Sequence, residues 1–333
     1  MPTWIRTLAA TLLIGAAVPA RADITVYAAL GYDQAVVDAF TRATGIPVRL
    51  VHLSTGPLLA RVQAEGARPQ WDVLWFDGEL AMRAFADRRM LRCDAGAGVT
   101  YTGAGRALMP ADHCYAPVTA TYAATMLVDA SQLPPAAWPR SWDDLAAPRL
   151  RGRVGMNNPA ISGPTFPFVA GMLQQRGDAG GEAYFTALKH NGLRVYPTNS
   201  VTLRALQYHQ IAVAVVQSSA ALGFARSRPN LRIVAPAPCT SLASDIAIGA
   251  QVQGKARDEA RKFEAFVLSP AGQHALLAGD ADADSNAQPL IAGVVPPASL
   301  AALHPATVQH LDPARWGVRE SSVDAWFTDH VVH

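Results

Sequence analysis

Residues 23–78 read DITVYAALGYDQAVVDAFTRATGIPVRLVHLSTGPLLARVQAEGARPQWDVLWFDG, and the order of elements in this stretch decides the fold. Three runs in it are rich in β-branched and apolar residues, as strands are, and the two segments between them have the spacing of amphipathic helices. We expect strands at 23–29, 47–53 and 71–78, with helices at 34–44 and through 63–65. This alternation predicts an α/β protein with a parallel sheet and right-handed crossovers.

The turn after the second strand, Ser54-Thr55-Gly56-Pro57, begins a helix. Ser54 or Thr55 can cap that helix, Gly56 allows a close backbone approach, and Pro57 suits the first helical position. Free N–H groups and the positive end of the helix dipole attract an anion at such a start. Because ligands of parallel sheets bind at the carboxyl ends of the strands, we expect a binding site where this turn and Asp77 converge.

The first residues indicate export. An apolar run at 8–18 follows Arg6 and precedes Ala20-Arg21-Ala22, which is the pattern of a cleaved secretory signal peptide. The run is too short to span about 30 Å of hydrocarbon. We expect residues 1–22 to be removed and the mature protein to be periplasmic.

The charge balance of the remaining chain excludes two classes of partner. The 333 residues include 28 Lys plus Arg and 26 Asp plus Glu, and removal of Arg6 and Arg21 leaves a formally neutral protein. Nucleic acids and membrane surfaces bind basic faces, so neither is an expected partner. A mature chain of about 310 residues predicts two domains.

Three cysteines in an exported chain predict one disulfide and one remaining thiol. Cys93, Cys114 and Cys239 allow three pairs. We favour Cys93 with Cys114, because these two flank one loop rich in glycine and alanine. In the chain-entropy model, closing a loop of that size stabilises the fold by ~3 kcal/mol. Cys239 is then expected to be a buried thiol.

Several segments resemble the periplasmic solute-binding proteins of ABC importers, in the group that holds ferric-iron, phosphonate and sugar-phosphate binders. Residues 26–78 look like the opening of these proteins, and five further motifs follow in the family's order. They are SWDDL at 141–145, GRVGMNNP at 152–159, ISG at 161–163, AVAVV at 212–216 and FVLSPAGQ at 266–273.

The resemblance implies a type 2 periplasmic binding protein fold, in which two α/β lobes joined by two hinge crossings close on a solute. We place the crossings near 116–122 and 234–238. The first lobe is then discontinuous, with residues 23–117 and 236–333, and the second comprises residues 118–235. The family also implies a membrane permease and an ATPase as partners.

Two further helix starts lie in the predicted second lobe. Ser162, Gly163 and Thr165 form a second Ser-Gly-Pro start, opposite the one at Ser54. Two facing helix starts make a good clamp for one oxyanion. Asn199 and Ser200 precede a third helix, as caps or as ligands, in a region that the resemblance places at the cleft.

Departures from the family pattern bear on the solute. Ferric binders of this group resemble one another in a His after the first strand, a carboxylate after the third, and a Tyr pair. Here the His position falls near Gly31 and the Tyr pair near Ser219-Ala220, so of these ligands only the carboxylate, Asp77, remains. Ferric iron prefers anionic oxygens, so iron is disfavoured unless Tyr32 or a bridging anion supplies them.

The expected solute is therefore a small oxyanion that also carries an ammonium group or hydroxyls. A phosphonate or phosphate fits the hydroxyl and N–H groups of the helix starts. Asp77 either binds the other end, as in 2-aminoethylphosphonate or a phosphorylated sugar, or only caps the next helix. We expect a monomer with no metal site and no cofactor. A remote alternative is an exported hydrolase that uses Ser54 or Ser162, although no Gly-x-Ser-x-Gly motif occurs.

Overall fold

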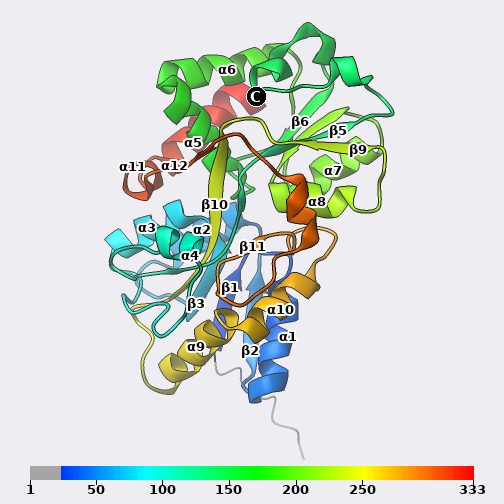
Figure 1. Ribbon diagram of the computed structural model, residues 1–333. Coiled ribbons are helices and arrows are strands. Elements are labelled where there is room, and N and C mark those ends of the chain that lie inside the picture. Colours follow the sequence, from blue (N-terminus) through cyan, green and yellow to red (C-terminus); the bar gives the residue numbers. More distant parts are fainter. Residues whose placement is uncertain (1–23) are drawn as a thin grey trace, which may run out of the picture.

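The computed structural model describes residues 24–333, which form two lobes, each built around its own β-sheet (Figure 1). The predicted signal peptide lies outside the described residues. Among the helices of residues 24–333, none is long and apolar enough to cross a bilayer.

The first lobe contains seven strands and the helices that cover them. Its elements are β1 (Ile24–Ala28), α1 (Asp33–Thr44), β2 (Val48–His52), α2 (Thr55–Glu65), β3 (Val73–Asp77), α3 (Glu79–Asp87), α4 (Gly103–Leu108), β4 (Ala116–Tyr122), β10 (Cys239–Ile248), α9 (Gly254–Val267), α10 (Pro270–Gly279), β11 (Gln288–Pro289), η4 (Ala298–Ala302) and β12 (Val308–Gln309).

The second lobe contains five strands. Its elements are β5 (Thr125–Asp129), η1 (Pro135–Ala137), η2 (Asp143–Ala146), η3 (Pro148–Leu150), β6 (Val154–Asn157), α5 (Thr165–Arg176), α6 (Asp178–His190), β7 (Arg194–Tyr196), α7 (Asn199–Gln207), β8 (Val213–Val216), α8 (Ser218–Ala225) and β9 (Leu231–Val234). Three C-terminal elements follow: α11 (Pro313–Gly317), α12 (Glu320–Phe327) and η5 (Thr328–Val332).

The predicted parallel unit is present. Strand β1 pairs in parallel with both β2 and β3, as the strand–helix–strand order requires. The first sheet has the order β11-β4-β10-β3-β1-β2, with β12 paired to β10, and the second has the order β7-β6-β8-β5-β9. Gly45 ends α1 in the left-handed conformation (φ 73°), for which glycine has no steric penalty.

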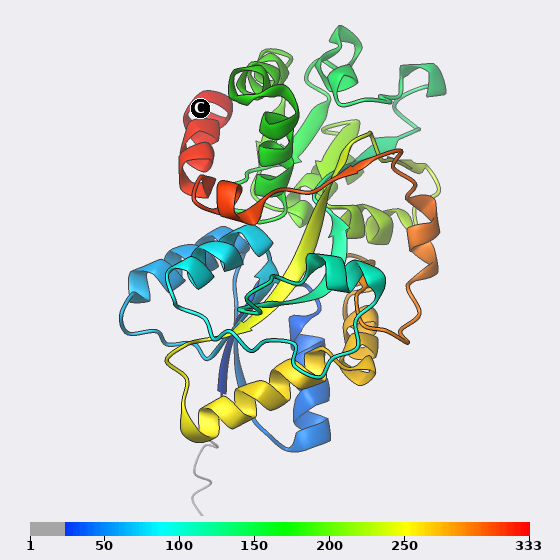
Figure 2. The ribbon, with the colours of Figure 1, turned by 60° about the vertical axis from the view of Figure 1, so that its left-hand side comes forward.

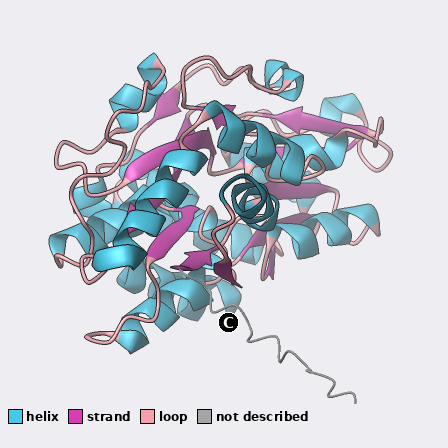
Figure 3. Ribbon diagram, turned by 90° about the horizontal axis from the view of Figure 1, so that it is seen from below, coloured by secondary structure: helices cyan, strands magenta, loops and turns pink. Residues whose placement is uncertain are grey.

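Successive side chains of β3 in the first sheet are buried on opposite faces of that sheet. Trp75 packs with α1 and α9, whereas its neighbours Leu74 and Phe76 pack with α2 and α3. Successive side chains of a strand point to opposite faces, so a strand buried on both sides reads as a continuous apolar run. The helices accordingly lie on both sides of the strands (Figure 3).

Two strands carry the chain between the lobes. The chain leaves the first sheet at the end of β4 and enters the second at β5, and it returns from β9 to β10. Strand β10 pairs antiparallel with both β3 and β4, and all ten of its residues are buried. Its length is visible in Figure 1, where it extends from one lobe to the other.

The C-terminal segment differs from the prediction that placed residues 236–333 entirely in the first lobe. Trp316, Phe327 and Val331 belong to the same apolar cluster as Phe185 of α6. Figure 2 shows the last helices beside α5 and α6 of the second lobe. The buried aromatic side chain of α12 finds its apolar partners there, whereas α11 also packs against α3 of the first lobe, so the C-terminal helices contact both lobes.

Cys93 and Cys114 form a disulfide, and Cys239 is a buried free thiol. The disulfide ties the segment after α3 to the start of β4. It therefore closes the loop that contains α4.

Replacing both Cys93 and Cys114 by serine should lower the free energy of unfolding by ~3 kcal/mol, because the unfolded chain gains loop entropy. Urea titration measures this value. Dithiothreitol should destabilise the unsubstituted protein to a similar extent and leave the double variant unchanged. Equal stability of the oxidised and reduced proteins would contradict the prediction.

Replacing Asp245 by asparagine should stabilise the protein at neutral pH. Asp245 lies on β10 with an exposed fraction of 0%, and neither of its oxygens has a hydrogen-bond partner among the described residues. Burial raises the pKa of this carboxyl well above its usual range, with further contributions from Glu79 and Asp77. The unfolded chain then binds fewer protons than the folded one above pH ~4, so stability falls as the pH rises.

Asp245→Asn should raise the free energy of unfolding at pH 7, because the asparagine has no carboxyl whose ionisation burial opposes. Urea titrations from pH 4 to 8 should show the difference growing with pH. A difference that does not change with pH would refute the assignment.

Candidate functional site

The candidate site is a pocket of about 530 Å³ between the lobes. In the first lobe it is lined by the segments that follow β1, β2 and β3. In the second lobe it is lined by the segments that follow β6, β7 and β8. The pocket therefore occupies the carboxyl ends of parallel strands in both sheets, where ligands of such sheets bind.

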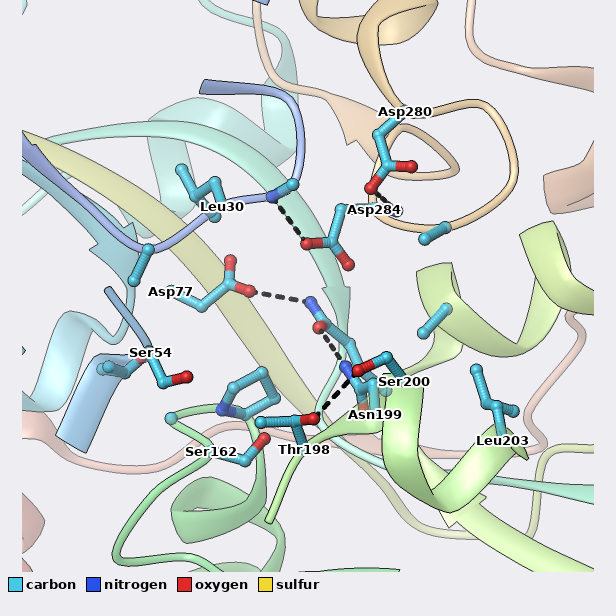
Figure 4. Close-up of a pocket in the computed structure, with 18 of the residues that line it drawn as sticks. Leu30, Ser54, Asp77, Ser162, Thr198, Asn199, Ser200, Leu203, Asp280 and Asp284 are labelled. Atoms are coloured by element: carbon cyan, nitrogen blue, oxygen red, sulfur yellow. Dashed lines mark hydrogen bonds between the residues drawn. The ribbon is translucent and has the colours of Figure 1, made fainter. Parts of the chain in front are cut away.

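One wall of the pocket consists of hydroxyls and amides at helix starts. Ser54 precedes α2 and makes no side-chain cap hydrogen bond, so its hydroxyl is not used by its own helix. Ser162 and Gly163 precede α5, and Asn199 and Ser200 begin α7. Figure 4 shows the side chains of Ser162, Asn199 and Ser200 gathered on one side of the pocket. Such a wall offers hydrogen-bond donors to an oxyanion.

A chain of hydrogen bonds runs beneath this wall and reaches the first lobe. The Asn157 side-chain amide donates to the Ser162 hydroxyl (3.3 Å) and to the Asn199 side-chain oxygen (2.6 Å). Asn199 donates to Gln217 (3.4 Å), and Gln217 donates to Asp77 across the lobes (2.9 Å). Asn157 and Gln217 are buried. These bonds fix the orientation of the polar side chains before a solute arrives.

Asp77 lies at the end of β3, where its carboxyl is buried. Burial raises its pKa to about 8, the negative charge of Asp284 raises it further, and the hydrogen bond from Gln217 acts in the opposite direction. A cation bound beside Asp77 would favour the ionised form.

The opposite wall carries an acidic segment that the sequence analysis did not identify. Asp280, Asp282 and Asp284 follow α10 and line the pocket. The backbone N–H of Gly31 donates to Asp284 (2.9 Å). Burial raises the pKa of Asp284 to about 6, the bond from Gly31 lowers it, and the charges of neighbouring aspartates raise it. The Asp-x-Asp-x-Asp alternation at 280–284 is the pattern that could have pointed to this wall.

Two basic side chains also line the pocket. Arg204 belongs to α7, on the side of the hydroxyls. His52 ends β2 and contacts Asp33 (2.7 Å) through its Nδ1. This hydrogen bond raises the pKa of His52.

Most of the predicted site residues line this pocket. They are Ser54, Thr55, Asp77, Ser162, Gly163, Asn199 and Ser200. Three other predicted residues do not.

Gly56, Thr165 and Tyr32 lie outside the lining of the pocket and make other contacts. The N–H of Gly56 donates to the Ile161 carbonyl (3.1 Å), and the N–H of Thr165 donates to the Ser162 carbonyl (2.9 Å). Tyr32 is buried in the first-lobe core, and its hydroxyl contacts Thr119 at 3.4 Å.

No tyrosine lines the pocket in the described part of the chain. At the expected Tyr-pair position, Ser219 and Ala220 are buried, and the preceding Ser218 accepts a hydrogen bond from the Tyr122 N–H (2.9 Å). Among residues 24–333 no group of three or more His, Cys, Asp or Glu side chains is arranged to hold a metal ion.

Comparison with known proteins identifies the family. The family model described as bacterial extracellular solute-binding protein matches residues 106–303, which is more than half of the chain. A major ferric iron-binding protein of Neisseria meningitidis serogroup B is 28% identical over 294 residues, covering 86% of this chain and 88% of that protein. A Salmonella paratyphi A protein named "Putative 2-aminoethylphosphonate-binding periplasmic protein" is 28% identical over 270 residues, covering 76% of each.

Among solved structures, the periplasmic binding protein AfuA from Actinobacillus pleuropneumoniae, with fructose-6-phosphate bound, superposes with a TM-score of 0.78. It is 15% identical, and the match covers 93% of this chain and 98% of that one. The resemblance inferred from the sequence motifs is thus confirmed. The chain has the type 2 periplasmic binding protein fold and belongs to the bacterial extracellular solute-binding protein family, whose members bind solutes and are not enzymes.

Proposed function

We propose that this protein is the periplasmic binding component of an ABC importer and that its solute is a small zwitterion with an oxyanion at one end. An aminoalkylphosphonate such as 2-aminoethylphosphonate fits this description, as does a phosphorylated compound with a cationic or hydroxylic end. The observation that carries the proposal is the opposite chemistry of two walls of one pocket. Hydroxyls and amides from helix starts face the acidic segment 280–284 (Figure 4).

The oxyanion end is assigned to the wall that contains Ser54, Ser162, Asn199 and Ser200. Phosphonate oxygens each accept several hydrogen bonds, and charged acceptors form stronger ones than neutral acceptors. The starts of α2, α5 and α7 add their positive dipole ends. Arg204 adds a full positive charge on the same side.

The cationic end is assigned to Asp77 and Asp284. Burial raises the pKa of both carboxyls, and a cationic partner beside them would offset this effect. An ammonium group donates three hydrogen bonds and would favour ionisation of both. The relative from Salmonella, by its name, binds a compound with these two ends.

A second candidate is ferric iron bound together with an anion. The relative from Neisseria is named as a ferric iron-binding protein, and the aspartates of segment 280–284 supply the anionic oxygens that iron prefers. In this case the hydroxyl wall would hold the bridging anion. The missing tyrosines argue against it.

The remaining parts of the proposal follow the family. Residues 1–22 would be cleaved on export, the mature protein would act as a monomer, and an inner-membrane permease with its ATPase would receive the solute. Closure of the lobes around the solute would signal the loaded state. Membership of a solute-binding family removes the hydrolase alternative.

Isothermal titration with 2-aminoethylphosphonate and with ethylphosphonate separates the two ends of the solute. Ser162→Ala should raise the Kd of both ligands by about tenfold, equivalent to ~1.4 kcal/mol, since both carry the oxyanion. Asp284→Asn should raise the Kd of 2-aminoethylphosphonate by a similar factor and leave that of ethylphosphonate unchanged. Asp258→Asn, on α9 and outside the pocket, is the matched control.

Ferric citrate is the third ligand of the same series. Tight binding of ferric citrate without measurable phosphonate binding would replace the proposed solute by iron. If Asp284→Asn raised the Kd of both phosphonates equally, the acidic wall would not be the site of the ammonium group.

The affinity for 2-aminoethylphosphonate should increase from pH 6 to 8. With its pKa near 8, Asp77 must lose a proton to pair with the ammonium, which costs up to about tenfold in Kd per pH unit below that value. Asp77→Asn lacks this titration, while the solute titrates identically in both proteins. The ratio of the Kd of the variant to that of the unsubstituted protein should therefore grow with pH, and a constant ratio would contradict the role of Asp77.

A further inference from the structure

The two lobes meet at backbone level on one side of the solute pocket. Gly56, in the first turn of α2, donates its N–H to the carbonyl of Ile161 in the second lobe (3.1 Å). A Cβ atom at Gly56 would overlap the Ala160 carbonyl oxygen and lie 2.9 Å from the Ala160 carbonyl carbon. Outside α2, its three nearest neighbours would all belong to the opposite lobe.

A second glycine makes the reciprocal contact. A Cβ at Gly163, in the second lobe, would lie 2.6 Å from the Cβ of Thr55 in the first. Thr55 and Gly163 line both the solute pocket and a second cavity of about 190 Å³ that reaches α12. The contact between them therefore forms the wall between the solute pocket and that cavity.

A third glycine makes an equivalent contact against the acidic segment. Gly223 lies on α8 of the second lobe. A Cβ there would overlap the backbone carbonyl of Asp282 and the backbone nitrogen of Ala283. Asp282 and Ala283 line the solute pocket. Glycine contacts between the lobes thus occur both at the hydroxyl wall and at the acidic wall.

We infer that Gly56 and Gly223 are positioning residues for lobe closure, which allow the two backbones to touch on either side of the solute without touching the solute themselves. A methyl group at either position meets backbone atoms, which cannot rotate away as a side chain can. It holds the lobes apart, and the effect appears in the closed population and in solute affinity. This inference rests on the proposed solute-binding function, but it concerns the closure rather than the identity of the solute.

Spin labels on the two lobes measure closure directly. Arg42→Cys on α1 and Ala183→Cys on α6 place one label on an exposed position of each lobe. Double electron–electron resonance on this doubly labelled protein should show a population of short distances. It should appear either without solute or with the tightest-binding compound among 2-aminoethylphosphonate, ethylphosphonate and ferric citrate. Gly56→Ala and Gly223→Ala should lose that population and keep the longer distances.

The same variants should bind solute more weakly, because the apparent Kd rises as the competent population falls, and we expect a rise of about tenfold. Gly103→Ala on α4 is the control, since the nearest atom to its Cβ would be 3.9 Å away. The thermal midpoint of the solute-free variants should match that of the control, because only the contact between the lobes changes.

Two results would overturn the inference. One is a short-distance population that Gly56→Ala and Gly223→Ala retain, and the other is its absence from the unsubstituted background under every condition. Failure of phosphonates to bind would instead refute the proposed solute, and the comparison of distances in the solute-free proteins would still decide the role of the glycines.

Discussion

The antiparallel ladder between β4 and β10 is the constraint on which the arrangement of the molecule depends. These two strands pair from Ala116–Ile246 to Tyr122–Ser241, at the point where the chain passes from one sheet to the other. Strand β10 also pairs with β3, which carries Asp77, and with β12, which leads to the C-terminal helices. Because all ten residues of β10 are buried, the ladder sets the position of one lobe relative to the other, while the short segments at its ends can bend.

The pocket follows from this arrangement. Parallel strands of two different sheets direct their carboxyl ends toward the same space, so helix starts from both lobes face each other. The bonds from Asn157 through Asn199 and Gln217 to Asp77 then connect the two lobes through polar side chains. The polar side chains of the pocket are therefore held by a network that spans both lobes.

The distribution of charge in the pocket is asymmetric, and this asymmetry distinguishes candidate solutes better than the overall resemblance does. Relatives with similar identity are named for ferric iron and for 2-aminoethylphosphonate, and the fold is shared with a sugar-phosphate complex. The fold therefore does not decide the solute. The decision depends on which atoms line each wall, and here buried carboxyls face hydroxyls and amides.

Local patterns were sufficient for the elements and for most of one wall. The helix starts at Ser54 and Ser162 are recognisable because capping residues, glycine and proline act within a few positions of one another. The close backbone approach expected at Gly56 is present, with its N–H bonded to Ile161 of the other lobe, whereas the ring of Tyr32 packs in the core. In both cases a partner far away in the sequence takes the group.

The sequence by itself determined the alternation of strands and helices, the parallel order of β1, β2 and β3, and the family, because periodicity and short motifs are properties of neighbouring residues. Only the tertiary structure placed residues 280–284 opposite the hydroxyl wall, Gln217 against Asp77, and the C-terminal helices between α3 and the second lobe. These contacts join residues that are far apart in the chain. Their positions depend on how two sheets are oriented by one shared pair of strands, which no local pattern encodes.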